Sequence, residues 1–408
     1  MISVELFIKG ARLIDPSCGI DDILDIVAAE GKIKEIGKGL TSKGQVIEGE
    51  GLVVCPGFVD MHTHMRDPGL IYKEDLTSGS RAAAAGGVTT LLAMPNTAPP
   101  IDSPKRLGEA KINEGKKACV HVVQAAAMTI GQEGKELCDY QGLQKAGCVA
   151  LSDDGKAVAD GGTMREVLQE AKKYNLLPIA HCDDVSLIRG GAMNEGETAK
   201  ALGVKGNPAV AEEVIIARDI LLAQSVDYRV HIAHVSSGRS VQLIREAKAR
   251  GAYVTCETAP HYISLTDEVV AQKGTDAKMN PPLRSRRDVS ELIAGIKDGT
   301  IDAIATDHAP HSKENKAGGL LKAASGIVGL ETMLGVCMKY LVTPGHITLN
   351  RLIELISTSP ARILGVPGGT LKVGAPADIT LFAPDEAYRV DRERFFSKGR
   401  NTPYDGET

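Results

Sequence analysis

The central part of the chain alternates short apolar segments with amphipathic ones, and this alternation constrains the fold more than any other feature. Apolar segments typical of strands begin near Val53, Val88, Cys119, Cys148, Pro178, Tyr228, Ala252 and Ile301. Helical periodicity marks the segments 75–87, 103–117, 163–175, 208–224 and 238–251. Eight strand-then-helix units favour a (β/α)8 barrel over an open doubly wound sheet. No Gly-x-Gly-x-x-Gly sequence opens the first helix, which also disfavours a dinucleotide-binding fold.

Both ends of the chain have a different pattern, in which apolar and polar residues alternate over short segments. Residues 32–36 (KIKEI) alternate in this way, and Gly31 supplies the backbone freedom that a tight turn requires. The segment 369–384 (GTLKVGAPADITLFAP) has a similar pattern. We therefore expect one small β domain from residues 1–53 plus 366–408, beside a barrel of residues 54–365.

The composition and charge of the chain argue against several classes of function. The 408 residues carry a net charge of -5, which argues against a nucleic-acid or membrane-surface binder. No signal peptide and no apolar run long enough to span a bilayer is visible, so we expect a cytoplasmic protein. The eight cysteines form no Cys-x-x-Cys pair, and we expect all of them to be core residues.

A His-x-His pair lies at the end of the first apolar segment. Residues 53–69 (VVCPGFVDMHTHMRDPG) deliver His62 and His64, which point to the same face if the segment is a strand. Both imidazoles can then reach one metal ion. Arg66 follows two residues later, where its guanidinium could hold a substrate carboxylate.

Polar residues also follow the other apolar segments, where a barrel places its active site. These residues are Asn96, Asp153, Asp154, His181, His234, Glu257 and Asp307. We take His234 as the metal ligand and His231 as structural, because an odd offset puts His231 on the other strand face. Asp307 could ligate a metal and also accept a proton from water. His121 lies inside an apolar segment and is expected to be a packing residue.

The adjacent aspartates Asp153 and Asp154 pose a choice. Neighbouring residues on a strand face opposite ways, so only one should point into the barrel mouth. Two divalent ions held by four histidines would need an anionic bridge, which either aspartate could supply. Spacing alone does not decide between them.

Taken together, these motifs resemble those of the dihydroorotases of the amidohydrolase superfamily, over nearly the whole chain. The matching stretches are DMHTHMRDPG, TTLLAMPNTAPPID, LSDDG, AHCDD, HVSS, TCETAPHY, KMNPPLR, ATDHAPHSKENK and KGRNTPYDG. The resemblance implies a (β/α)8 barrel flanked by a β-sandwich. It also implies Zn²⁺ as the cofactor, with two ions per subunit expected, although one would be compatible.

Carried over by position, the resemblance implies a ligand set. His62, His64 and Asp307 would hold the more buried zinc, His181 and His234 the second, and Asp154 would bridge the two. Dihydroorotases of another type, and hydantoinases, use a carboxylated lysine as the bridge. The stretch LSDDG has no lysine at that place, which favours the aspartate-bridged type.

The resemblance also implies substrate contacts and an activity. The implied contacts are His64, Arg66, Asn96, Asn280, His311, Ser325 and Gly326, although the family often has an aromatic residue where this chain has Ser325. The implied reaction is the reversible cyclisation of N-carbamoyl-L-aspartate to dihydroorotate, with Asp307 moving the proton. Implied partners are the small-molecule substrate, further copies of the chain in a homo-oligomer, and aspartate carbamoyltransferase. The alternatives are a hydantoinase or allantoinase, or a non-catalytic scaffold for that transferase; the complete ligand set disfavours the scaffold.

Overall fold

A closed barrel of eight parallel strands forms the centre of the computed structural model, which describes residues 5–408. The barrel strands are β6 (Phe58–Thr63), β7 (Val88–Ala93), β8 (His121–Gln124), β9 (Ala150–Leu151), β10 (Leu177–Ala180), β13 (Val230–Ile232), β14 (Val254–Thr258) and β15 (Ala303–Ile304). They pair in two runs, β6-β7-β8 and β9-β10-β13-β14-β15. Parallel bridges between Ala126 and Leu151 and between Thr63 and His308 close the ring. The predicted barrel is confirmed.

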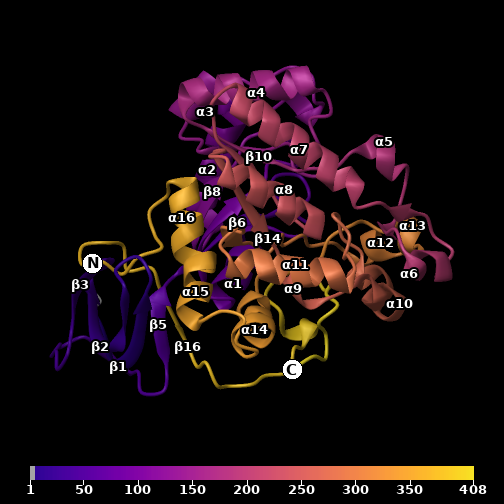
Figure 1. The fold of residues 1–408 in the computed structure, drawn as a ribbon. Coiled ribbons are helices and arrows are strands. Elements are labelled where there is room, and N and C mark those ends of the chain that lie inside the picture. The colour runs from indigo at the N-terminus through magenta and orange to yellow at the C-terminus, as the bar shows by residue number, and fades with distance from the viewer. Residues whose placement is uncertain (1–4) are drawn as a thin grey trace.

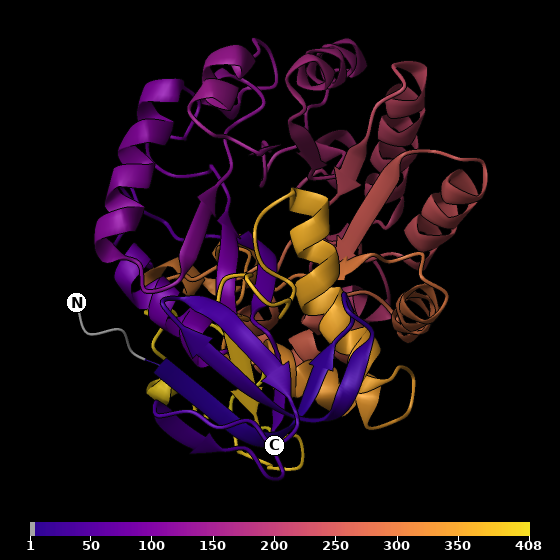
Figure 2. The same cartoon turned by 90° about the vertical axis from the view of Figure 1, so that its left-hand side faces the viewer.

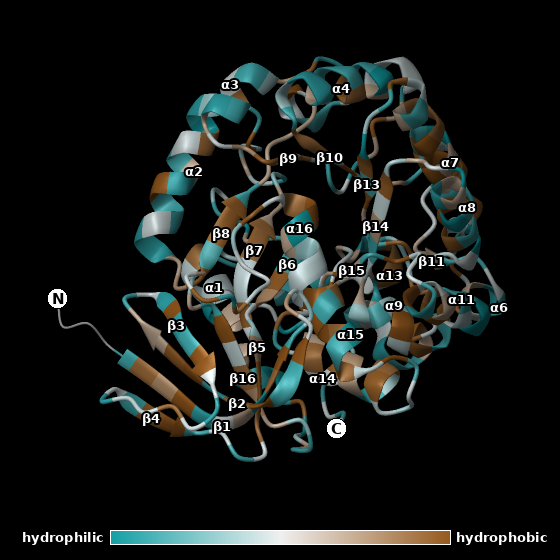
Figure 3. Cartoon of the chain, turned by 60° about the vertical axis from the view of Figure 1, so that its left-hand side comes forward, coloured by the Kyte–Doolittle hydropathy of each residue, from teal (hydrophilic) through white to brown (hydrophobic). Residues whose placement is uncertain are grey.

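Helices surround the strands, as Figure 3 shows for α2, α3, α4, α7 and α8. The outer helices are α1 (Leu76–Ala85), α2 (Pro104–Lys117), α3 (Tyr140–Lys145), α4 (Gly161–Tyr174), α7 (Val210–Ser225), α8 (Gly238–Ala249) and α11 (Arg286–Lys297). Side chains cap several of their first turns: Asp75 and Ser285 form capping boxes, and Asp160 accepts from the Thr163 amide. Asn175, with φ of 53°, ends α4 in the left-handed region that asparagine tolerates.

Shorter elements lie in the connections. They are α5 (Val185–Ile188), β11 (Met193–Asn194), α6 (Glu197–Ala201), β12 (Gly206–Asn207), α9 (Pro260–Ser264), α10 (Val270–Lys273), α12 (Lys313–Lys316), α13 (Gly319–Lys322) and α14 (Met333–Cys337). After them, α15 (Leu349–Ile353) and α16 (Ser359–Leu364) are joined by a π-helical turn. Together they form one continuous helix, drawn in gold in Figure 2, which lies across the ring of strands. The Ser357 hydroxyl donates to the carbonyl of Gly57, just before β6, so the helix covers the amino-terminal end of the barrel.

Both ends of the chain contribute to a second sheet beside the barrel (Figure 1). Its strands are β1 (Glu5–Asp15), β2 (Ile20–Ala29), β3 (Lys32–Gly37), β4 (Gln45–Glu48), β5 (Val53–Pro56) and β16 (Ile379–Phe382). The order is β16-β5-β1-β2-β3, with β4 also on β1, and β16 runs antiparallel to β5. The expected pairing of the two ends is confirmed, as is the turn at Glu30 and Gly31, where φ is 54° and 70°.

The apolar run that begins at Val53 is two strands rather than the single strand expected. β5 belongs to the small sheet and β6 to the barrel, and Gly57 lies between them. The Gly57 amide donates to the carbonyl of Asp378, and a Cβ at Gly57 would lie 2.1 Å from the Thr89 hydroxyl. Only glycine fits where the chain passes from one sheet to the other.

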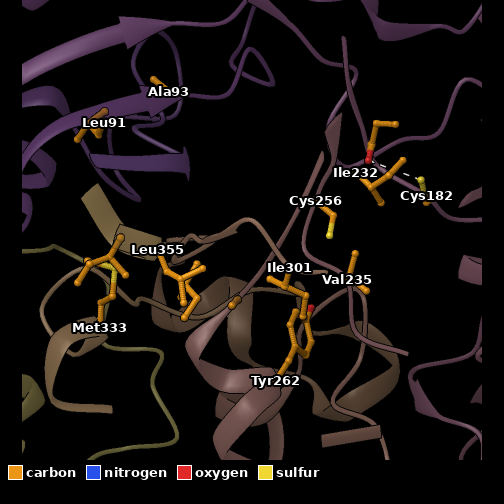
Figure 4. Packing of buried hydrophobic residues seen from close by; sticks show 14 of the residues in the cluster. Leu91, Ala93, Cys182, Ile232, Val235, Cys256, Tyr262, Ile301, Met333 and Leu355 are labelled. Atoms are coloured by element: carbon orange, nitrogen blue, oxygen red, sulfur yellow. Dashed lines mark hydrogen bonds between the residues drawn. The ribbon is translucent and has the colours of Figure 1, made fainter. Parts of the chain in front are cut away.

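Apolar side chains fill the barrel on both sides of its wall. Inside it, Val59, Leu92 and Ile179 pack with Leu364 of α16. Outside it, a larger cluster joins strands to helices, including Leu91, Ile232, Cys256 and Ile301, labelled in Figure 4. Across residues 5–408, no helix is both long and apolar enough to cross a bilayer.

Three side chains expected in the core lie at the surface instead. Cys18 and Cys119 are exposed, whereas the other six cysteines are buried as expected. His121 begins β8 with its side chain 65% exposed and lies 3.2 Å from Asp378. Apolar neighbours in the sequence do not ensure that a residue is buried when it lies at or beyond the end of a strand.

Candidate metal centre

The polar residues that follow the strands meet at one end of the barrel. His62 lies in β6 and His64 just beyond it, while Asp154, His181, His234 and Asp307 follow β9, β10, β13 and β15 within three residues. All six side chains are buried. The carboxyl ends of parallel strands face the same side of a barrel, so residues far apart in sequence converge there.

Asp154 lies at the centre of this cluster. Its Oδ1 is 3.1 Å from His62 Nε2, 3.4 Å from His234 Nε2 and 3.5 Å from His181 Nδ1, and its Oδ2 is 3.5 Å from His64 Nε2. Two groups have ligand atoms that all lie within 4.8 Å of one another: His62, His64 and Asp154, and Asp154, His181 and His234. Asp154 is common to both groups, as a bridging position requires.

Asp153 faces away from the cluster. Its carboxylate accepts hydrogen bonds from the amides of Met128 and Thr129, at 2.8 and 3.2 Å, and from the Thr129 hydroxyl. The choice between the two aspartates, which the sequence left open, is therefore made by the loop after β8.

Asp307 approaches the cluster from the last strand. Its Oδ1 is 3.1 Å from His64 Nε2 and 3.8 Å from His62 Nε2. The backbone is left-handed at Asp307, His234 and Arg66, with φ of 48°, 35° and 58°. Non-glycine residues in this region are strained, and such strain concentrates at functional sites, where surrounding structure enforces it.

His62 and Asp154 each stabilise the charged form of the other. Burial acts to lower the pKa of His62, but the carboxylates of Asp154 and Glu257 together outweigh it and hold that pKa well above its ordinary value. Burial acts to raise the pKa of Asp154, and the charge of His62 with hydrogen bonds from His181 and His234 holds it well below its ordinary value.

The nitrogen atoms of the cluster fit a divalent cation. His181 Nδ1 and His234 Nε2 are directed at each other 2.9 Å apart, an arrangement that a shared cation explains. The Nε2 atom of His62 is buried without a hydrogen-bond partner among the described residues. Imidazole nitrogens with carboxylate oxygens suit a divalent metal.

Glu257 of β14 orients His62 from behind. His62 Nδ1 donates to its Oε1 over 2.8 Å, which leaves Nε2 directed at Asp154. The other oxygen, Oε2, is 3.3 Å from His231 Nε2. Burial acts to raise the pKa of Glu257, but hydrogen bonds from His231 and His62 lower it to about 2. The sequence placed Glu257 at a strand end without a role, and placed His231 outside the site, although the two histidines share this carboxylate.

Arg66 lies buried beside the cluster. Its guanidinium has only a 3.4 Å contact to the Pro310 carbonyl and lies 3.5 Å from His311 Nε2. Within residues 5–408, no carboxylate lies within ion-pair distance of it. Burial lowers the pKa of Arg66 to about 10. A buried cation without an ionic partner is suited to bind an anion.

The remaining predicted contacts lie around these groups. Asn96 Oδ1 accepts from His64 Nδ1 over 2.9 Å, so Asn96 fixes the ring of His64. His311 Nε2 donates to the carbonyl of Ser325 over 2.8 Å, next to Gly326. Burial, followed by the charge of Arg66, lowers the pKa of His311 to about 2, so this ring is neutral at physiological pH.

Asn280 is held at a different side of the cluster. Its Nδ2 donates to Asp183 over 2.8 Å, and Asp183 lies 3.8 Å from His181 Nε2. Asn280 is therefore linked through one carboxylate to His181 of the cluster, a link that no spacing in the sequence indicated.

Solved structures share this architecture. L-Hydantoinase (dihydropyrimidinase) from Arthrobacter aurescens has a TM-score of 0.88 and 28% identity, over 98% of this chain and 92% of its own. A dihydropyrimidinase from Brevibacillus agri has a TM-score of 0.86 at 23% identity, over 99% and 91%, which supports the fold alone. The barrel and its buried His/Asp cluster thus define a cyclic amide hydrolase of the amidohydrolase superfamily.

Sequence comparison identifies the family within this class of hydrolases. A family model described as dihydro-orotase-like matches residues 51–240. The dihydroorotase of Citrifermentans bemidjiense is 49% identical over 406 residues, 99% of this chain and 95% of the relative. That of Acetivibrio thermocellus is 46% identical over 98% and 94%. The chain belongs to the dihydroorotase family, as its motifs predicted.

Proposed function

We propose that this chain catalyses the reversible cyclisation of N-carbamoyl-L-aspartate to (S)-dihydroorotate and water, the third step of pyrimidine biosynthesis. The observation that carries the proposal is the buried, ionically unpaired Arg66 beside a His/Asp cluster suited to divalent metal. Such a site combines an anchor for a substrate carboxylate with a centre that can activate water. Hydantoin and allantoin carry no carboxylate to place there.

We propose zinc as the metal, with two ions per subunit. His62, His64 and Asp307 would hold one ion, His181 and His234 the other, and Asp154 would bridge them. Zinc favours such nitrogen and oxygen donors. When bound, divalent ions lower the pKa of a water molecule toward neutrality and polarise an amide carbonyl.

Asp307 is proposed as the catalytic acid–base. Burial acts to raise its pKa, but the hydrogen bond from His64 and the charges of the histidines outweigh burial and keep it low, so the carboxylate is ionised. It can accept the proton of the attacking water and return it to the leaving ring nitrogen in the hydrolytic direction. The contact with His64 Nε2 at 3.1 Å orients this carboxylate, and the surrounding structure enforces the left-handed backbone at Asp307.

The remaining residues bind and orient the substrate. Arg66 and Asn96 would hold its carboxylate, and Asn280 would be a further substrate contact. Neutral His311 and the backbone of Ser325 and Gly326 would contact the ring, and His64 would lie against both substrate and metal. Without the carboxylate anchor, the reacting carbonyl would not be held over Asp307.

The test is hydrolysis of dihydroorotate by the purified chain, followed by ultraviolet absorbance, with zinc counted on the same sample. We expect turnover with bound zinc, and loss of turnover with retained fold in Asp307→Asn. Turnover of hydantoin or allantoin without turnover of dihydroorotate would overturn the proposal.

Several broader features are proposed alongside the reaction. We infer a cytoplasmic homo-oligomer, able to bind aspartate carbamoyltransferase, with the domains 1–53 plus 366–408 and 54–365, except that β5 (Val53–Pro56) keeps residues 54–56 in the small sheet. Light scattering measures the oligomer, and adding that transferase to the assay shows whether it raises turnover. Limited proteolysis would locate the domain boundary.

A further inference from the structure

The segment 397–402 (SKGRNT) near the C-terminus reaches back to the barrel and lies against the loops of the candidate site. We propose that Asn401 in this segment is a positioning residue, whose amide holds His311 and Gly326 where the substrate ring is contacted. This inference rests on the proposed function, which makes those two residues substrate contacts.

The Asn401 amide connects two separate loops. Its Oδ1 accepts from the His311 amide over 3.0 Å, and its Nδ2 donates to the carbonyls of Ala309 and Gly326 over 3.0 and 2.9 Å. Its own carbonyl accepts from the Val328 amide over 2.9 Å. Asn401 is 2% exposed, and both N–H groups and the oxygen of its side-chain amide are hydrogen-bonded.

These bonds act where the two loops must stay in register. His311 reaches Ser325 through its ring, and Gly326, with φ of 130°, packs so closely that a Cβ there would lie 2.6 Å from the Ala309 Cβ. The amide of Ala309 also donates to the carbonyl of Ile327. Moving either loop by a fraction of an ångström would shift the His311 ring relative to Arg66, and small displacements at a site cost catalysis heavily.

The segment that carries Asn401 is itself anchored. The Ser397 hydroxyl and the Lys398 amide donate to the buried carboxylate of Glu74, which also lies 3.3 Å from His308 Nε2. At Gly399 a Cβ would lie 2.6 Å from Val328 Cγ1 and 2.8 Å from Asn401 Oδ1, so only glycine permits the close approach. Asn401 is therefore presented to the site by a fixed backbone.

Tyr404 supplies a matched control. Its buried hydroxyl lies 2.6 Å from Ser264 Oγ and ties the same end of the chain to the barrel, without a hydrogen bond to His311 or Gly326. Tyr404→Phe removes one contact of the chain just after this segment but leaves the two substrate loops connected. A purely structural role of Asn401 would give both variants the same kinetics.

The experiment measures kcat and KM for dihydroorotate, with bound zinc, in the wild type, Asn401→Ala, Asn401→Asp and Tyr404→Phe. Asn401→Asp keeps the acceptor for the His311 amide but sets an oxygen against the two carbonyls. We expect KM to rise about tenfold or more in both Asn401 variants, with a smaller change in kcat and unchanged zinc content. Tyr404→Phe should stay within about twofold of the wild type in KM.

Each other outcome overturns a defined claim. An unchanged KM in the Asn401 variants, or an equal rise in Tyr404→Phe, overturns the positioning role while the proposed function stands. If neither Asn401 variant folds, the amide is a stability element and the positioning role is rejected. A wild type that does not turn over dihydroorotate overturns the proposed function, and this inference with it.

Discussion

Replacing Arg66 by methionine tests the anion site directly, because the two roles open to this residue predict opposite effects on stability. Arg66 is 8% exposed, and its guanidinium has no ionic partner among residues 5–408. Burial lowers the pKa of Arg66 to about 10, which corresponds to a cost of about 3 kcal/mol for holding the cation in the folded protein. A bound carboxylate would offset that cost.

Arg66→Met should therefore weaken substrate binding and stabilise the free protein. A loss of about 3 kcal/mol in binding raises KM for dihydroorotate by about 100-fold. The Arg66→Met variant should turn over dihydrouracil, which lacks the carboxylate, at least as fast as the wild type does. The melting temperature without substrate should rise, because methionine fills the space without an unpaired buried charge. Absorbance kinetics and a thermal melt measure both effects.

Arg284 is the matched control, since it is also buried but its guanidinium has an ionic partner and hydrogen-bond acceptors. It lies 3.7 Å from the Glu212 carboxylate and donates to Ser236 Oγ and Asn194 Oδ1. Arg284→Met should lower the melting temperature, because removing one partner leaves a buried carboxylate uncompensated. The reasoning fails if Arg66→Met is destabilised as Arg284→Met is, or if dihydroorotate and dihydrouracil lose activity equally.

Three further predictions follow from the geometry. Asp154→Ala should lose the second metal and most activity, whereas Asp153→Ala should retain more metal; elemental analysis showing the reverse would refute the assignment. Glu257→Gln should weaken metal binding by about 10- to 100-fold in a chelator competition, because Glu257 orients His62, and unchanged affinity would contradict that. Burial raises the pKa of Glu114 to about 7, above its unfolded value, so its ionisation costs stability as pH rises from about 4.5 to 7. Glu114→Gln should thus raise the melting temperature at pH 8 by more than at pH 5, and an equal change at both would exclude this cause.

Local patterns of apolar and polar residues predict much of the architecture. Alternation of apolar and amphipathic segments predicts a barrel because strands and helices bury side chains at different periods. Polar residues at the ends of those segments, from His62 to Asp307, predict the site because a barrel gathers its strand ends. Local patterns were less informative about where an element begins or ends. They did not predict that the apolar run from Val53 is divided into two strands at Gly57, or that His121 lies exposed at the start of β8.

What remained undecided depends on contacts between segments distant in the chain. The sequence alone determined the barrel, the pairing of the two ends of the chain in the small sheet, and the residue types available at the site. Only the tertiary structure decided that Thr129 holds Asp153 away from the cluster, that Glu257 is shared by His62 and His231, and that Asn401 connects two site loops. The reason is that spacing along one strand determines which face a side chain occupies, whereas its partner is supplied by another segment when the barrel closes.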